Sequence, residues 1–244
     1  MKKNSRSFLH VFSSAALLGL AAAAQAGSVQ VSVTDAEGKP ASDVVVLVSS
    51  TAKPPAMPAA APVVIAQQDL RFVPFLTVVP VGATLRFVNR DAFDHHVRST
   101  ATGPLGNVPS TINFEFRLDA AAAKAGGATA ASDALKPAAT AASPKRGDAS
   151  NADVRLNVAG PVGLGCHLHS SMRGQVYASP TPWFGKTDAN GAVTIDGVPD
   201  GAAEIALWHG DQLQVQPGQR VQVSDTPVKA SAQLNFTPRR RRGG

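Results

Sequence analysis

Hydrophobic and polar residues alternate with a period of two along much of this chain, which predicts β-strands. In the segment 28–33 three valines alternate with polar residues, so that one face of the strand is apolar. The run 44–48 is continuously apolar and rich in β-branched residues, which indicates a buried strand. Alternation returns at 112–118. Further strands are expected at 63–65, 72–79, 83–89, 155–158, 174–178, 192–195, 203–208 and 220–223. We find no convincing amphipathic helix among these segments, so we expect an all-β fold.

Two segments interrupt this pattern. Segment 119–152 is dominated by alanine, with glycine, serine, threonine and proline, and it contains one leucine and no aromatic residue. Such a composition cannot bury enough apolar surface to offset the entropy lost on ordering, so we predict a disordered insertion. Segment 52–62 carries four prolines and is expected to be a linker.

The amino terminus is typical of an export signal. Lys2, Lys3 and Arg6 precede an apolar stretch, and Ala24-Gln25-Ala26 fits a small-x-small cleavage site. Segment 1–26 is therefore expected to be a signal peptide, after which no stable membrane span remains. Without this segment and the arginines at 239–242, 16 basic residues face 17 acidic ones, so the net charge of +6 gives no reason to expect nucleic-acid binding. Segment 237–244 is expected to be a flexible basic tail.

The residues that carry chemistry gather in two segments. Cys166, the only cysteine, is followed by His169 three residues later and by Met172 three residues after that. Thiolate, imidazole and thioether form a soft ligand set that copper prefers. The segment 89–97, far upstream, holds His95 and His96 and can supply a second imidazole. Two histidines, a cysteine and a weak axial methionine are the ligands of a blue-copper electron-transfer site, so the two segments together are predicted to bind one copper ion.

Both segments resemble those of a known family. The pattern Cys-x-x-His-x-x-Met-Arg-Gly-x-Val at 166–176 resembles the copper loop of amicyanin and, more broadly, of plastocyanin-like cupredoxins. The pattern Asn-x-Asp-x-x-x-His-x-Val at 89–97 is similar to the segment around their first histidine ligand. Leu-Gly-Cys-x-x-His with a downstream Thr-Pro-x-Phe-x-Lys-Thr-Asp is also similar to plastocyanin-like proteins of methylamine utilisation. The resemblance implies a Greek-key β-sandwich around one type 1 copper ion. The loop departs from the amicyanin pattern at Leu168 and Ser170, which stand where that loop has prolines.

The resemblance also assigns roles to individual residues. His95 holds the family position before x-Val, and strand alternation lets only one of His95 and His96 face a metal, so His96 is the alternative ligand. His167 is expected to be a bystander. Asn89 and Asp91 are either residues that orient the ligand loops by hydrogen bonds or plain turn residues.

The two ends of the chain resemble a second family. Segment 28–50, with Asp-Ala-x-Gly-Lys-Pro, resembles the first half of a carboxypeptidase-regulatory-like β-sandwich, and segment 185–208 resembles its second half. This resemblance implies a small, discontinuous Ig-like domain made of residues 27–52 and 182–236. The cupredoxin domain, residues 63–180, is then inserted between the two halves.

The expected function is electron transfer rather than catalysis. We expect a periplasmic or secreted copper protein that cycles between Cu(II) and Cu(I), with a redox protein such as a dehydrogenase or cytochrome as its partner. The alternative is a copper-binding or carrier protein without an electron-transfer role, and a third reading is a structural β-sandwich that has lost its copper. The sequence shows no Ser-His-Asp set and no phosphate-binding glycine loop, so no enzymatic activity is expected.

Overall fold

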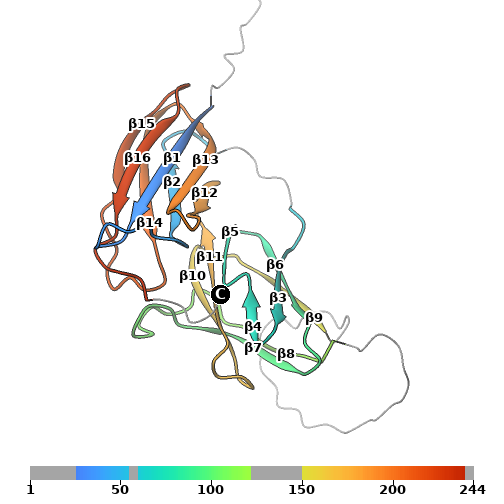
Figure 1. Ribbon diagram of the computed structural model, residues 1–244. Coiled ribbons are helices and arrows are strands. Elements are labelled where there is room, and N and C mark those ends of the chain that lie inside the picture. The colour runs from blue at the N-terminus through green and yellow to red at the C-terminus, as the bar shows by residue number, and fades with distance from the viewer. Residues whose placement is uncertain (1–25, 55–59, 122–149, 240–244) are drawn as a thin grey trace, which may run out of the picture.

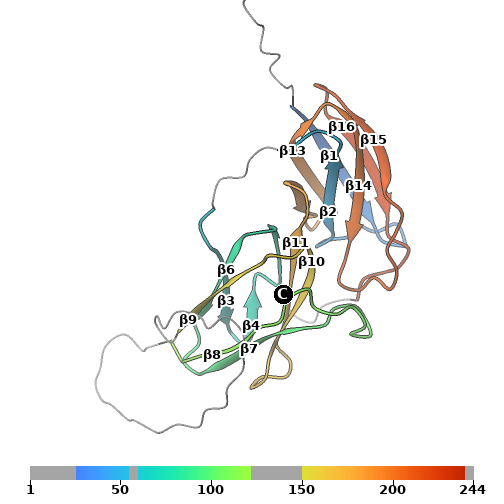
Figure 2. The same ribbon diagram turned by 180° about the vertical axis from the view of Figure 1, so that it is seen from behind.

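The computed structural model describes residues 26–54, 60–121 and 150–239, and its regular secondary structure there consists of β-strands. The strands form four sheets, which associate in pairs into two units (Figures 1 and 2). The prediction of an all-β fold is confirmed. The predicted signal peptide except Ala26, most of the alanine-rich insertion and residues 240–244 lie outside the described residues.

The inner unit is a two-sheet sandwich built from the middle of the chain. Its five-stranded sheet has the order β5 (Leu76–Pro80), β11 (Arg173–Ser179), β10 (Gly160–Cys166), β7 (His95–Thr100) and β8 (Glu115–Leu118). Its four-stranded sheet has the order β4 (Arg71–Val73), β3 (Val63–Gln68), β6 (Thr84–Asn89) and β9 (Asn151–Arg155). In the core the ring of Phe87 packs against those of Phe114 and Phe116, at centroid distances of 5.7 and 5.4 Å.

The outer unit joins strands from both ends of the chain. A three-stranded sheet places β1 (Ala26–Thr34) between β13 (Ala192–Pro199) and β16 (Val228–Gln233), as the blue and red ribbons of Figure 1 show. A four-stranded sheet has the order β12 (Trp183–Lys186), β2 (Val45–Ser50), β14 (Gly201–Trp208) and β15 (Gln219–Val223). The unit has an apolar core of its own. We propose that the outer and inner units are the two domains expected from the sequence.

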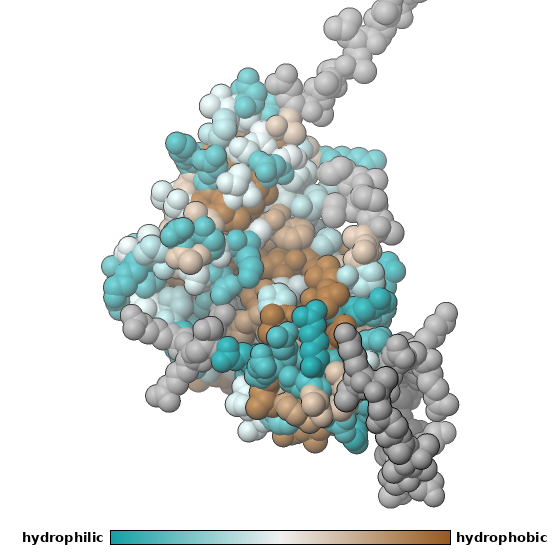
Figure 3. All heavy atoms as spheres, turned by 45° about the vertical axis from the view of Figure 1, so that its right-hand side comes forward, coloured by the Kyte–Doolittle hydropathy of each residue, from teal (hydrophilic) through white to brown (hydrophobic). Residues whose placement is uncertain are grey.

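A third apolar cluster lies where the two units meet. Val45, Leu47 and Trp208 of the outer unit cluster with Leu76 of the inner unit. Tyr177 on β11 packs against Trp208 with a ring-centroid distance of 5.0 Å. On the face shown in Figure 3, hydrophobic side chains gather mainly near the middle of the molecule. The units are therefore held together by side-chain packing as well as by the chain that passes between them.

Several element boundaries differ from those predicted. Strands β10, β12 and β16 were not expected, and the predicted strand 72–79 is divided into β4 and β5 around Pro74, which has no N–H to donate to a sheet. The predicted insertion is ordered at both edges, because β9 begins at Asn151 and the Asp119 carbonyl accepts a hydrogen bond from Asn89. Arg239, placed in a flexible tail by the sequence, is bound to Asp211. In the part of the chain that the structure describes, no helix has the length and hydropathy to cross a membrane.

Candidate metal centre

Strand alternation brings the first two predicted ligands to the same place. β7 and β10 are antiparallel neighbours, and their register sets Cys166 opposite Val97. His95 lies two residues before Val97, so both predicted ligands point to the same side of the sheet, into the core. Cys166 is 3% exposed and His95 is fully buried. The two residues lie at the end of β10 and the start of β7, where the strands leave the sheet.

Three of the four predicted ligands converge on one point. The Sγ atom of Cys166 lies 3.8 Å from Nδ1 of His95 and 3.5 Å from Nδ1 of His169. One ligand atom from each of these residues lies within 4.8 Å of the others. The rings of His95 and His169 meet edge to face, with centroids 4.9 Å apart. Two imidazole nitrogens and a thiol sulfur thus face one shared position.

The loop after Cys166 carries the other two predicted ligands. The N–H of Met172 donates a hydrogen bond to the carbonyl of His169, at 3.0 Å, which closes the loop into a turn. Met172 is 1% exposed and belongs to the same buried cluster as Cys166. The structure therefore places Met172 in the same buried core as Cys166, while His169 lies closer to solvent.

Asp91 holds His95 in a defined orientation. Its carboxylate lies 2.9 Å from Nε2 of His95, the ring nitrogen that faces away from Cys166. The backbone N–H groups of Asp69 and Leu70 donate to the same carboxylate, at 2.8 and 3.2 Å. Burial opposes ionisation of Asp91, but these N–H groups and His95 outweigh that effect and hold the pKa of the carboxyl below its usual value. A carboxylate that accepts a hydrogen bond from Nε2–H keeps the proton on Nε2. The lone pair of Nδ1 is then free to bind a metal.

Asn89 fixes the turn that carries Asp91. Its side-chain oxygen accepts a hydrogen bond from the Asp91 N–H, and its Nδ2 donates to the carbonyls of Phe93 and Asp119. Both Asn89 and Asp91 are buried. Of the two roles left open by the sequence, the structure favours orientation of the ligand segment.

The sulfur of Cys166 also accepts a hydrogen bond from the backbone. The N–H of His96 points to Sγ at 3.4 Å. Such a bond stabilises negative charge on the sulfur and is one of the features that tune a copper–thiolate site. This hydrogen bond could not be predicted from the sequence, because it depends on the pairing of two distant strands.

The next residue along each strand points away from this centre. The side chains of His96 and His167 lie on the outer face of the sheet, where both contact Glu115. His96, the alternative ligand considered from the sequence, is therefore turned away from Cys166, although its backbone N–H reaches the sulfur. Phe93 was not identified from the sequence, yet its ring lies 5.3 Å from those of both His95 and His169.

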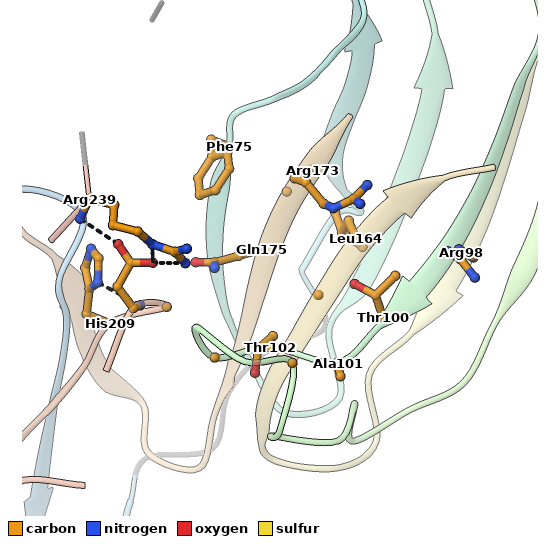
Figure 4. Close-up of a pocket in the computed structure, with 16 residues that line it drawn as sticks. Phe75, Arg98, Thr100, Ala101, Thr102, Leu164, Arg173, Gln175, His209 and Arg239 are labelled. Carbon is orange, nitrogen blue, oxygen red and sulfur yellow. Dashed lines mark hydrogen bonds and ion pairs between the residues drawn. The ribbon is translucent and has the colours of Figure 1, made fainter. Parts of the chain in front are cut away.

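A cavity of about 700 Å³ lies between the two units and is separate from the metal centre (Figure 4). Arg98 and Arg173 line it from the inner unit, and His209 and Arg239 line it from the outer unit. Arg239, which Figure 4 shows on one side of this space, forms an ion pair with Asp211 at 2.8 Å. Neither His95 nor His169 lines this cavity.

The donor set fits copper. Thiolate and imidazole together select copper or zinc, and a buried thioether beside them is typical of blue-copper sites. The His95 imidazole is held by a carboxylate, as is usual for a metal-bound histidine. The cluster of His95, Cys166, His169 and Met172 is thus consistent with a type 1 copper site.

No protein-family model matches the chain, and no curated protein matches it. Solved structures match it in part. The Cu(I) form of an amicyanin mutant is 17% identical over 55% of this chain and 99% of its own, with a TM-score of 0.31. A purple cupredoxin from Nitrosopumilus maritimus is 18% identical over 48% of this chain and 99% of its own, with a TM-score of 0.31. A copper-containing nitrite reductase from Thermus scotoductus SA-01 is 21% identical over 52% of this chain but only 25% of its own. Each of these matches covers about half of this chain.

Proposed function

We propose that this protein is an exported type 1 copper protein that carries single electrons between redox partners. The proposed ligands are His95, Cys166, His169 and Met172. The observation that carries the proposal is the convergence of two imidazole nitrogens on one buried thiol sulfur. Copper, when bound, supplies a one-electron couple between Cu(II) and Cu(I).

The residues around the ligands favour electron transfer over catalysis. Asp91 and Asn89 fix the segment of His95, and the turn between His169 and Met172 fixes the ligand loop. A rigid ligand set changes little between two oxidation states, which suits the transfer of single electrons. Four protein ligands also leave no coordination position for a substrate, in contrast to catalytic metal sites.

The surface next to His169 offers a place for a partner to dock. His169 is partly exposed, and the side chains of Phe93 and Leu168 beside it are 42% and 55% exposed. Exposed apolar side chains are common where proteins meet. We propose that a redox protein of the same compartment, such as a dehydrogenase or cytochrome, approaches here. The export signal predicted at 1–26 supports a periplasmic or secreted location.

The test is the visible absorption and EPR spectrum of the purified mature chain titrated with Cu(II). We expect an intense thiolate-to-copper band and a narrow copper hyperfine splitting, both lost in Cys166→Ala. His167→Asn is the matched control, because it alters a neighbouring imidazole that faces away from the centre, and it should keep the band. A weak band that survives Cys166→Ala would contradict the proposal. An intense band without a reversible one-electron wave would favour the alternative of a copper carrier.

A further inference from the structure

A second group of metal-binding side chains lies on the outer face of the same strands. His96 follows His95 in β7, and His167 follows Cys166 at the end of β10. Strand alternation that turns His95 and Cys166 into the core turns His96 and His167 outward. Glu115, the first residue of β8, lies on this outer face beside them.

The three side chains converge on one oxygen atom. Nε2 of His96 lies 3.0 Å from Oε1 of Glu115, and Nε2 of His167 lies 3.1 Å from the same atom. The imidazole rings have centroids 5.0 Å apart. The backbone supports this arrangement, because the N–H of His167 donates to the carbonyl of His96 at 3.0 Å. Two imidazoles and a carboxylate therefore meet at the surface without any help from the buried centre.

We propose that His96, His167 and Glu115 bind one divalent transition-metal ion, Zn²⁺ or Cu²⁺, at a surface site separate from the type 1 centre. Imidazole nitrogen and carboxylate oxygen are ordinary ligands of both ions. Ligand atoms that lie about 2.0–2.1 Å from a tetrahedral zinc ion are about 3.3 Å from one another. The two observed nitrogen–oxygen distances are close to this value, whereas the two imidazole nitrogens must turn toward one another to share an ion, and three protein ligands leave a fourth position for water.

The surroundings allow such a site to form. The side chains of His96, His167 and Glu115 are 35%, 43% and 52% exposed, so the two rings have room for the rotation that directs both nitrogens at one ion. Two basic residues pair with this group across the strands, Arg98 opposite Glu115 and Arg117 opposite His96. Arg117 is engaged by the carboxylates of Asp94 and Asp119, and Arg98 lines the cavity between the units. Their charges are thus partly offset or directed away from the proposed ion.

The test is an isothermal titration of the full mature chain with Zn²⁺. We expect His96→Asn and His167→Asn each to lose one equivalent of bound zinc, or to bind that equivalent at least about tenfold more weakly. Glu115→Gln should also lower the affinity for zinc. Glu37→Gln is the matched control, since Glu37 is an exposed carboxylate paired with Lys39 in the outer unit, and it should bind as the wild type does. Equal stoichiometry and affinity in the wild type and the three variants would overturn the proposal.

A second arm separates this site from the type 1 centre. The variant Cys166→Ala removes the thiol and should still bind zinc at the surface site. In that background, Cu²⁺ should give an EPR signal with a wide copper hyperfine splitting and nitrogen couplings from imidazole, and adding His167→Asn should remove it. A signal that is unchanged by His167→Asn would exclude copper from the surface site. Failure of the thiolate band would sink the proposed function but would leave the zinc stoichiometry unaffected.

Discussion

At the scale of the residue, Asp91 is the side chain on which the candidate centre depends most. Two consecutive residues, Asp69 and Leu70, adopt φ angles of 53° and 59°, in the left-handed region that non-glycine residues avoid. Their N–H groups both point at the Asp91 carboxylate. Strained backbone of this kind costs on the order of 1–3 kcal/mol per residue and persists only where other contacts maintain it. The strain is therefore localised where it orients His95.

Replacing Asp91 by asparagine should weaken copper binding. The asparagine amide can accept from Asp69, but its NH₂ group faces the Nε2–H of His95. The imidazole then avoids two opposed donors by moving its proton to Nδ1, the nitrogen that faces Cys166. We expect an affinity for copper about 10–100-fold lower, measured by competition with a chelator. Asp153→Asn, which alters an exposed carboxylate paired with Arg86, is the control and should leave the affinity unchanged. Equal affinities in the two variants would show that Asp91 does not set the tautomer.

At the scale of the element, the hairpin of β10 and β11 uses glycine to bring neighbouring segments close. Gly163 lies against the backbone carbonyls of Thr100 and Ala101, which a Cβ atom at that position would meet at 2.7 Å. Gly174 lies against the ring of Phe72, a buried residue of the opposite sheet. Gly163 thus allows β10 to lie close to β7 in the same sheet, and Gly174 allows the start of β11, just after the ligand loop, to lie close to the opposite sheet.

Alanine at position 174 should destabilise the inner unit. Its Cβ would lie 2.9 Å from Cβ and 3.1 Å from Cγ of Phe72, and a buried ring has little room to move. Overpacking of this kind costs about 1–3 kcal/mol in the free energy of unfolding, which urea denaturation measures. Gly165→Ala is the comparison, because its closest contact, at 3.1 Å, is the methyl group of the half-buried Thr100. If Gly174→Ala lowers the free energy of unfolding no more than Gly165→Ala does, the ring of Phe72 repacks freely around the new methyl group.

Some strands could be predicted from the sequence, and the glycine-rich strand β10 could not. Alternation located β1, and an apolar run rich in valine located β2, because their patterns match the burial of a strand. Strand β10 was missed because its sequence, Gly-Pro-Val-Gly-Leu-Gly-Cys, is rich in residues that strands usually lack. The ligands could be proposed from spacing and residue type. Phe93, Glu115 and the two left-handed residues could not, because their roles come from contacts between distant strands.

At the scale of the whole molecule, the two units are tied by the chain and by the apolar cluster around Trp208, and a polar contact within the outer unit lies near the carboxyl terminus. The backbone N–H and guanidinium of Arg239 bind the carboxylate of Asp211, at distances from 2.8 to 3.2 Å. Both residues line the cavity between the units. This contact fixes the end of the described chain beside the inner unit.

The contribution of Asp211 should depend on pH. Burial alone would raise the pKa of this carboxyl, but the hydrogen bonds and charge of Arg239 outweigh it and hold the pKa below its usual value. A carboxyl with a lowered pKa stabilises the folded state above the unfolded pKa of about 3.9, and this stabilisation is lost as pH falls through the folded pKa. The difference in unfolding free energy between wild type and Asp211→Asn should therefore be constant above about pH 5 and shrink in acid. Arg239→Gln should lower the free energy of unfolding at neutral pH as Asp211→Asn does. A difference between wild type and Asp211→Asn that grew on acidification would contradict this account.

Trp208 should decide whether the two units unfold together. Each unit has its own buried core, and the cluster between them depends on a ring that is 9% exposed and packs on Tyr177. Truncating a buried tryptophan costs about 3–5 kcal/mol, and here that loss falls on the contact between the units. We expect Trp208→Ala to divide the calorimetric unfolding transition into two. Trp183→Ala is the matched control, because Trp183 lies inside the outer core and donates to the Gly197 carbonyl, so its loss should lower the stability of that unit alone. If Trp208→Ala instead unfolds in one transition at a lower temperature, the chain connections suffice to couple the units, and the apolar cluster contributes stability without setting cooperativity.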